Sequence, residues 1–281
     1  MIVIADMGST KTDWSFTDGS TVVKNIQTRG FNPYFYSTEQ ITEILNEDFK
    51  GFDLNDVTEL YFYGAGCSNE EKCKSVEDAI KHHFPNTIIE VEHDLLASAR
   101  ALCGKTPGIA CILGTGSNTC MYDGTYVIAN NPSLGFLLGD EGSGSHLGKE
   151  LIKCYFYNEL PKDMAQKLER TYNISRDMLL DDIYAHGAPN SYLATFAKFL
   201  IENKSNKAIK QIILDSFDEF FKRHIHKYDS YEKIPVNFIG SIAFYFKDVL
   251  QEVAKKHNAT IGLVIKAPIA KLIEYHSQVK V

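Results

Sequence analysis

The sequence lacks the features of several large protein classes. No apolar run is long enough to cross a membrane, and no basic segment precedes the first apolar stretch, so we expect neither a membrane helix nor a signal peptide. Lysine and arginine form no dense cluster, and the formal net charge is −7 at pH 7, which argues against nucleic acid and anionic membranes as partners. These absences favour a cytoplasmic protein.

The cysteines also lack a recognisable spacing. None of the six forms the Cys-x-x-Cys pattern that is typical of metal and redox sites. Cys111 and Cys120 stand in apolar strand contexts, where buried thiols are common. We therefore expect all six thiols to be reduced.

Two familiar nucleotide motifs are incomplete. The segment Gly104-Lys105-Thr106 has the end of a P-loop, but Ala99 stands where that motif needs its first glycine, and Pro107 blocks the helix that should follow. The segment Gly114-Thr115-Gly116 lacks the third glycine of a dinucleotide fingerprint. The sequence thus predicts neither a P-loop nor NAD binding.

The sequence contains one strand-and-turn pattern that occurs twice. An apolar strand near residues 2–5 leads to a glycine/hydroxyl turn that begins at Gly8, and a second apolar strand near 109–113 leads to a turn that begins at Gly114. A further strand and an Asp-Gly hairpin follow in each copy. Such turns bring backbone N–H groups against anions, and two that face one another would clamp a phosphate chain.

This duplication predicts two α/β lobes. The breaker-rich segment 104–108 is the boundary, which gives an N-terminal lobe over 1–106 and a C-terminal lobe over 107–266. Strands followed by alternating helices and strands predict a mixed sheet with helices on both faces of each lobe. The expected strands lie near 2–5, 12–17, 21–26, 59–63, 87–91, 109–129 (a three-strand unit), 235–239 and 260–265. The expected helices lie near 38–49, 69–83, 95–103, between 144 and 227, and near 242–256 and 268–277.

Four acidic residues, in three segments of the chain, are candidates for chemistry. Asp6 ends the first strand just before a glycine turn, where a carboxylate can hold magnesium, although a turn Asp that binds nearby N–H groups is the alternative. Asp94 stands at a strand end and at a predicted helix N-cap, so it is either a cap or a base that accepts the proton of an attacking hydroxyl. Asp140 and Glu141 lie between glycines after an apolar stretch, which favours a partly buried loop whose carboxylates accept from sugar hydroxyls over a solvated turn.

Other conspicuous residues have structural interpretations. The pairs His82-His83 and His224/His226 have no carboxylate or cysteine at metal-ligand spacing, and we expect them on exposed faces. The aromatic runs 34–36, 61–63 and 244–246 are predicted to pack in the core or between lobes. Capping residues are expected at Ser37 (with Gln40) and Ser68 (with Glu71).

Taken together, these residues resemble the sugar kinase/Hsp70/actin ATPase superfamily, and within it the N-acetylglucosamine kinase group of the BadF/BadG/BcrA/BcrD ATPase family. The resemblance covers nearly the whole chain. Residues 6–12 are similar to the first phosphate motif, 113–118 to the second and 236–243 to the adenosine motif, and 135–143 is the most group-specific stretch. The resemblance implies two ribonuclease-H-like lobes with a nucleotide cleft between them, and a C-terminal helix over about 267–281 that packs on the first lobe.

The resemblance also implies site residues. Asp6 would hold Mg²⁺, Asp94 would be the catalytic base, and Asn32, Asp94 and Asp140 would contact the sugar. The implied ATP-binding residues are Gly8, Ser9, Thr10, Lys11, Gly114, Thr115, Gly116, Gly240 and Ser241.

Three departures from the family pattern stand out. Met7 replaces a residue that is often glycine, and Ser241 replaces the second glycine of the adenosine motif. The chain also has no segment similar to the cysteine-bearing one with which activator ATPases of the same family hold an iron–sulfur cluster.

The resemblance implies phosphorylation of N-acetylglucosamine, or a close amino sugar, at its 6-hydroxyl, with ATP and Mg²⁺ as cosubstrate and cofactor. Two alternatives stay open: an ATP-driven conformational switch or activator of a partner enzyme, and a kinase for glucosamine or a muramic acid derivative. The expected partners are ATP and an amino sugar, without nucleic acid or membrane, and a homodimer stays open.

Overall fold

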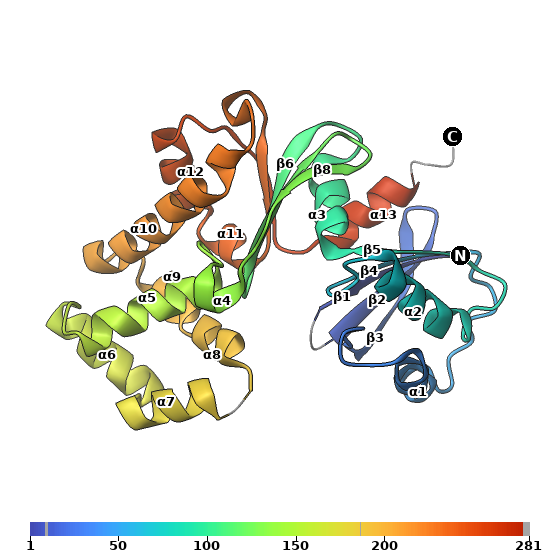
Figure 1. Ribbon diagram of the computed structural model, residues 1–281, viewed down its shortest axis with the longest axis horizontal. Helices are drawn as coiled ribbons and strands as arrows, with labels where there is room; N and C mark the ends of the chain where they lie inside the picture. Colours follow the sequence, from blue (N-terminus) through green and yellow to red (C-terminus); the bar gives the residue numbers. More distant parts are fainter. Residues whose placement is uncertain (9–10, 186, 278–281) are drawn as a thin grey trace. The chain divides into compact units, whose positions relative to one another are not determined.

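The computed structural model describes residues 1–8, 11–185 and 187–277. Its contacts divide the chain into two compact units, each built on one five-stranded sheet (Figure 1). Unit 1 comprises Met1–Lys105, Gly124–Tyr126 and the segment from Ala267, and unit 2 comprises Thr106–Asp123 and Val127–Lys266. Among the described residues, no helix has both the length and the apolar character needed to cross a membrane.

The sheet of unit 1 has the strand order β3-β2-β1-β4-β5. β1 pairs antiparallel with β2, and β2 with β3, whereas β4 and β5 run parallel to β1. The strands are β1 (Ile2–Met7), β2 (Lys11–Asp18), β3 (Thr21–Arg29), β4 (Glu59–Gly64) and β5 (Ile88–His93). The helices are α1 (Thr38–Asp48), α2 (Glu70–Lys81), α3 (Asp94–Cys103) and α13 (Ile269–Ser277).

The apolar face of this sheet packs on α1 and α2. Trp14 is fully buried there, with the rings of Phe49, Phe62 and Phe84 centred 5.0, 5.6 and 6.3 Å from its own. Alternation along β1 places Val3, Ala5 and Met7 in the same core and directs Ile4 and Asp6 to the opposite face. This alternation therefore leaves Asp6 outside the apolar core of α1 and α2.

A buried polar network fastens α13 to unit 1. Arg100 of α3 donates to the Tyr63 hydroxyl (2.8 Å), so the hydroxyl proton of Tyr63 is directed to His276 Nε2 at 2.7 Å. The His276 ring also stacks on Tyr61, with centroids 3.6 Å apart. Burial and the charge of Arg100 lower the pKa of His276 to about 3, which keeps the ring neutral and able to accept.

Unit 2 repeats the arrangement, with the order β10-β9-β6-β7-β8 and the same alternation of antiparallel and parallel pairs. The strands are β6 (Gly108–Leu113), β7 (Ser117–Tyr122), β8 (Val127–Asn131), β9 (Val236–Ile239) and β10 (Ile261–Ile265). The longer helices are α5 (Gly144–Phe156), α6 (Lys162–Tyr172), α7 (Arg176–Tyr184), α10 (Lys207–Arg223) and α12 (Lys247–Lys256). The shorter ones are α4 (Gly135–Leu138), α8 (Pro189–Thr195), α9 (Ala197–Asn203), α11 (Ser241–Tyr245), η1 (Ile225–Lys227) and η2 (Tyr231–Lys233). The predicted fold class, mixed sheets covered by helices, is confirmed.

Several helix ends differ from the predictions. The capping box of Ser37 and Gln40 is present, but α2 is capped by Asn69 rather than Ser68, because the Asn69 side chain accepts from the Lys72 amide. α3 is capped by His93 and not by Asp94. The helix expected over 242–256 is broken at Phe246, which is buried with φ −108° and ψ 22°.

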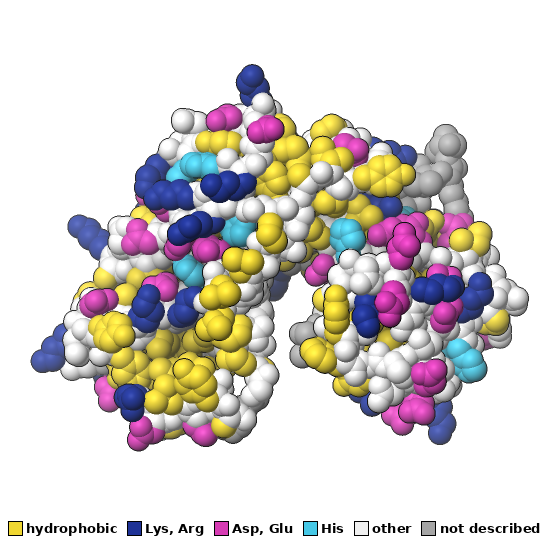
Figure 2. All heavy atoms as spheres, viewed as in Figure 1, with side chains coloured by type: hydrophobic (Ala, Val, Ile, Leu, Met, Phe, Trp, Pro, Cys, Tyr) yellow, Lys and Arg dark blue, Asp and Glu magenta, His cyan; other side chains and the backbone are white. Residues whose placement is uncertain are grey.

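The burial of aromatic and histidine residues also differs in part from the predictions. Phe62 and Tyr63 are buried as expected, whereas the run 34–36 is exposed because it forms a loop after β3 instead of a strand or helix. His224 is buried, which contradicts its expected exposed position, because it lies at the C-terminal end of α10 and bonds to distant residues. None of the six cysteines, all within the described residues, forms a disulfide, and Cys111 and Cys120 are buried as predicted. Basic and acidic side chains are interspersed over the face in Figure 2.

The contact of α5 with α8 gives a stability prediction. A Cβ on Gly148 would lie 1.9 Å from the carbonyl oxygen of Leu193, so Gly148→Ala must force the two helices apart. We expect a loss of about 1–3 kcal/mol in the free energy of unfolding, measured by urea titration. Lys153→Ala on the exposed side of α5 is the control and should change it by less than about 0.5 kcal/mol. Equal stability of Gly148→Ala and wild type would contradict the close packing.

Candidate active site

The first glycine turn joins β1 to β2. The Gly8 amide donates to the Lys11 carbonyl at 2.9 Å, which closes the turn, and the Lys11 ammonium pairs with Asp13 at 2.8 Å. Ser9 and Thr10, two of the predicted phosphate-binding residues, lie outside the described residues. The described part of the turn thus places Gly8 and Lys11 directly after Asp6 at the end of the first strand.

The parallel register of unit 1 brings Asp6 and Asp94 to one edge of the sheet. Asp6 is level with Tyr63 in β4, Tyr63 is level with Glu92 in β5, and Asp94 follows two residues later. Burial, together with the charges of Asp94 and Asp13, raises the pKa of Asp6 to about 6. Burial also raises the pKa of Asp94. Two partly desolvated carboxylates that repel one another are an arrangement that a cation or a donated proton would relieve.

The cap of α3 leaves a separate role open for Asp94. His93 Nδ1 accepts from the Leu96 amide at 3.0 Å, and because that nitrogen acts as an acceptor, His93 is neutral there. Burial lowers the pKa of His93, in agreement with this state. Asp94 is therefore the first residue of the helix and not its N-cap, although its carboxylate still accepts from the backbone amides of Leu95 and Asp94.

Asn32 lies against the loop that follows β4. Its side-chain oxygen accepts from the Tyr34 amide at 2.9 Å, and a Cβ on Gly66 would come within 2.6 Å of the same oxygen. The next residue of that loop, Cys67, is close enough to Asp94 for the charge of Asp94 to raise the thiol pKa, after the larger effect of burial. Asn32 and Asp94 thus flank the same loop of unit 1.

The second glycine turn, between β6 and β7, is oriented by α5. The carbonyl oxygens of Gly114 and Thr115 accept from the amides of Gly144 and Ser145 at 2.8 and 3.0 Å. In a trans peptide the N–H group is directed opposite to the carbonyl, so the amides of Thr115 and Gly116 point away from α5. The turn therefore presents two N–H groups on the side where α5 does not lie.

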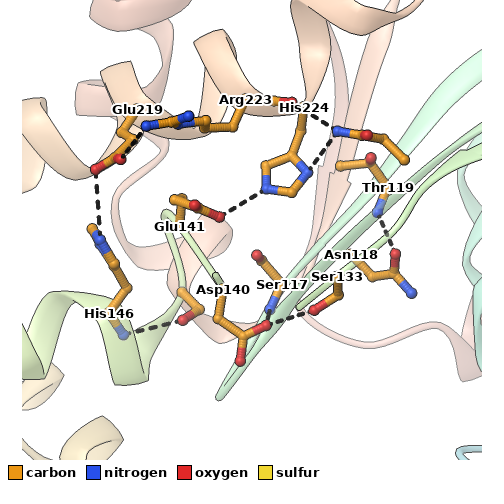
Figure 3. A network of polar contacts seen from close by, with 12 residues as sticks. Ser117, Asn118, Thr119, Ser133, Asp140, Glu141, His146, Glu219, Arg223 and His224 are labelled. Carbon is orange, nitrogen blue, oxygen red and sulfur yellow. Dashed lines mark hydrogen bonds and ion pairs between the residues drawn. The ribbon is translucent and has the colours of Figure 1, made fainter. Parts of the chain in front are cut away.

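Asp140 lies directly against this turn (Figure 3). One carboxylate oxygen, Oδ1, accepts from the Ser133 hydroxyl at 2.8 Å and from the Ser117 amide at 3.3 Å. A Cβ on Gly116 would be 2.9 Å from the other oxygen, Oδ2. Asp140 is 6% exposed, which agrees with the buried-loop interpretation of 139–142, although Leu134, Leu137 and Leu138 before it are exposed.

A cavity of about 540 Å³ begins at the second turn. Gly114 and Thr115 form one end, and α8, α9 and α11 supply mostly apolar walls together with Lys198 and Glu202. Gly240 is at φ +120°, and a Cβ there would lie 2.2 Å from the Leu113 carbonyl oxygen, so only glycine fits. The full lining is Gly114, Thr115, Gly144, Ala194, Thr195, Ala197, Lys198, Ile201, Glu202, Ser241, Ile242 and Tyr245.

The structure therefore groups the predicted site residues within each unit. Unit 1 brings Gly8, Asp6 and Asp94 to the edge of its sheet, with Asn32 beside the neighbouring loop. Unit 2 brings its turn, Asp140, Gly240 and Ser241 together. Sequence reasoning missed the α8–α9 wall of the cavity, because helical residues that line a cavity carry no short motif. It also placed His224 on an exposed face, because its partner Glu141 lies 83 residues earlier in the sequence.

Comparison with solved structures identifies relatives. A protein of Porphyromonas gingivalis that carries the provisional name N-acetylglucosamine kinase is 37% identical, with 100% of each chain covered and a TM-score of 0.95. The chain belongs to the same family as this protein. No family model and no curated protein matches the chain.

More distant matches share the fold of this N-acetylglucosamine kinase-like family. A Chromobacterium violaceum protein with the same provisional name is 14% identical, covers 98% of each chain and has a TM-score of 0.70. The protein MreB5 of Spiroplasma citri, solved with ADP, is 10% identical, with 99% of this chain and 95% of that chain covered and a TM-score of 0.55. The fold is therefore that of the actin-like ATPases, as predicted.

The raised pKa of Asp6 gives a pH-dependent prediction for this family member. Because the pKa rises from 3.8 to about 6 on folding, ionised Asp6 destabilises the protein above pH 6, and the effect disappears below pH 4. We expect Asp6→Asn to raise the free energy of unfolding by about 2–3 kcal/mol at pH 7.5 and to leave it unchanged at pH 4.

Urea titrations at both pH values measure this difference. Asp163→Asn, at an exposed carboxylate of α6, is the control and should shift neither value by more than about 0.5 kcal/mol. A destabilised Asp6→Asn variant at pH 7.5 would show that the carboxylate is not held under repulsion.

Proposed function

We propose that this protein transfers the γ-phosphoryl group of ATP to the 6-hydroxyl of N-acetylglucosamine or a close amino sugar. The single observation that carries the proposal is the full-length similarity, at 37% identity, to the P. gingivalis protein of that provisional name. The residues quoted for the BadF/BadG/BcrA/BcrD resemblance support a place in that ATPase group.

The phosphates of ATP are assigned to the two glycine turns. N–H groups that no carbonyl of the same turn occupies are good anion donors, and the orientation of Thr115 and Gly116 supports this role in unit 2. In unit 1 we assign Gly8, Ser9, Thr10 and Lys11 to phosphate binding as well. Lys11 can exchange its exposed partner Asp13 for a phosphate, because exposed ion pairs are weak.

Asp6 is the proposed residue for Mg²⁺. Hard cations prefer carboxylate oxygens, and a cation next to Asp6 would offset the repulsion that raises its pKa. Over the described ranges, no cluster of three or more His, Cys, Asp or Glu could hold a metal, which suits an ion bound by one carboxylate, water and phosphate oxygens. When bound, the ion would neutralise charge on the phosphate oxygens.

Asp94 is the proposed general base. Burial raises its pKa and so makes the carboxylate a stronger base than an exposed one. It would take the proton of the 6-hydroxyl as that oxygen bonds to the γ-phosphorus and the bond to the β–γ bridging oxygen breaks, with ADP as the leaving group.

Asn32 and Asp140 are the proposed sugar contacts. The Asn32 oxygen is already bonded to Tyr34, which orients the side-chain amide and directs its N–H₂ group elsewhere. Asp140 Oδ1 is similarly occupied by Ser133 and Ser117, and Oδ2 is the oxygen assigned to a sugar hydroxyl.

The cavity of unit 2 is the proposed site of the adenosine. Its walls are mostly apolar, as a purine ring requires, and Gly240 and Ser241 of the adenosine motif lie at its α11 side. The serine that replaces a glycine here lines the cavity with a small hydroxyl and leaves the volume largely open.

Turnover tests the proposal directly. ADP release should depend on an amino sugar, and Asp94→Asn should lower kcat by roughly 100-fold or more while ADP affinity, measured by calorimetry, stays within about twofold. Asp78→Asn on α2 is the matched control. ATP hydrolysis that no sugar accelerates, or purification with bound iron, would instead favour the switch or activator alternative.

A bulky side chain tests the adenosine site. Thr195 lines the cavity and is exposed, so Thr195→Trp should fill the volume without harming the fold and should raise the Kd for ADP roughly tenfold. Thr171→Trp, on the exposed part of α6, should leave the Kd unchanged. Unaltered ADP binding by Thr195→Trp would place the nucleotide elsewhere.

A further inference from the structure

His224 is the buried residue that ties the loop of Asp140 and Glu141 to α10 (Figure 3). It is 4% exposed, and its Nε2 lies 3.0 Å from Glu141 Oε2. Its other ring nitrogen, Nδ1, lies 3.1 Å from the side-chain nitrogen of Asn131 at the end of β8. His224 thus connects Glu141 and Asn131, which lie 83 and 93 residues earlier in the sequence, through hydrogen bonds of its two ring nitrogens.

The Arg223 carbonyl group determines which atoms donate and which accept in the hydrogen bonds of His224. The Asn131 side-chain nitrogen also lies 2.7 Å from the Arg223 carbonyl oxygen, which can only accept, so the atom that faces it must be the NH₂ group. The same NH₂ group faces His224 Nδ1, so Nδ1 must accept as well. The proton of the neutral ring is therefore on Nε2, which donates it to Glu141.

The hydrogen bond from His224 affects the pKa of Glu141. Burial alone would raise the pKa of Glu141, but the hydrogen bond from His224 holds that pKa below its usual value. The carboxylate is therefore ionised and held in place. A donor that bonds to an ionised acceptor makes one of the stronger hydrogen bonds in proteins.

The neighbouring Asp140 needs such support. Its φ of +57° is in the left-handed region, which is unfavourable for a residue that has a Cβ. Its carboxylate nevertheless reaches the Ser133 hydroxyl and the Ser117 amide in that conformation. A peptide conformation of this kind persists only where the surrounding bonds hold it, and the bond from His224 to the adjacent Glu141 is one of them.

We infer that His224 is a positioning residue for the acceptor sugar: through the proton on Nε2 it holds Glu141, and with it the backbone that aims the Asp140 carboxylate. This inference rests on the proposed function, in which Asp140 contacts the sugar. His224 itself touches no ligand, because it is buried and both ring nitrogens are bonded within the protein.

Two substitutions at His224 separate positioning from mere folding. His224→Leu removes the donor, whereas the amide nitrogen of His224→Gln can occupy the place of Nε2 and donate to Glu141. We expect His224→Leu to lower kcat/KM for the amino sugar roughly 10- to 100-fold, with ADP affinity within about twofold of wild type, and His224→Gln to recover most of the loss.

The matched control is His257→Leu. His257 is another buried histidine of unit 2, and it bonds to Asp218 and His226 instead of the loop. Its loss should lower stability without changing kcat/KM for the sugar. An equal loss of sugar turnover in His257→Leu and His224→Leu, or no rescue by His224→Gln, would overturn the positioning role.

An NMR measurement tests the hydrogen bonds of His224 independently of enzyme turnover. In ¹⁵N-labelled wild type at pH 7.5, the His224 ring should carry its proton on Nε2, and the Ser117 amide should shift in His224→Leu, return in His224→Gln and stay in place in His257→Leu. A proton on Nδ1, or an unmoved Ser117 amide, would overturn the inference. Wild-type protein that phosphorylates no amino sugar would overturn the proposed function, whereas an active wild type with unaltered His224→Leu would overturn only the role of His224.

Discussion

The architecture of unit 2 depends on the bonds between the turn after β6 and the first amides of α5. Helix N-termini have N–H groups without partners inside the helix, and here two of them bind the carbonyl oxygens of Gly114 and Thr115. The same bonds fix which way the turn's own amides point. One structural requirement, the capping of a helix, therefore also orients the amides to which the proposed function assigns the phosphates.

In unit 1 the corresponding constraint is the register of three parallel strands. Because β1, β4 and β5 end at one edge, the chain cannot bring Asp6 and Asp94 there without partly desolvating two like charges. The apolar core around Trp14 and the hydrogen bonds that hold α13 offset this cost within the same unit. The proposed function requires two carboxylates of this kind, which a cation or a proton would stabilise.

The sequence predicted what short-range patterns determine. The duplicated strand and glycine turn, the alternation in the strands and the capping box at Ser37 are local, and the structure has them. Interactions between distant segments were not predicted: the burial of His224 depends on Glu141 and Asn131. One local detail was also missed, because the ring nitrogen of His93, and not the carboxylate of Asp94, accepts from the Leu96 amide and caps α3. The walls of the cavity in unit 2 come from α8 and α9, whose positions follow from packing such as that of Gly148 on Leu193.

The central proposal is that the glycine turn of each unit binds the phosphates of ATP. Titration of ¹⁵N-labelled protein with Mg²⁺ and a non-hydrolysable ATP analogue tests it through the backbone amide signals of Gly8 in unit 1 and of Thr115 and Gly116 in unit 2. The account predicts that all three amides shift together with one dissociation constant. A response confined to one turn, or two distinct dissociation constants, would contradict it.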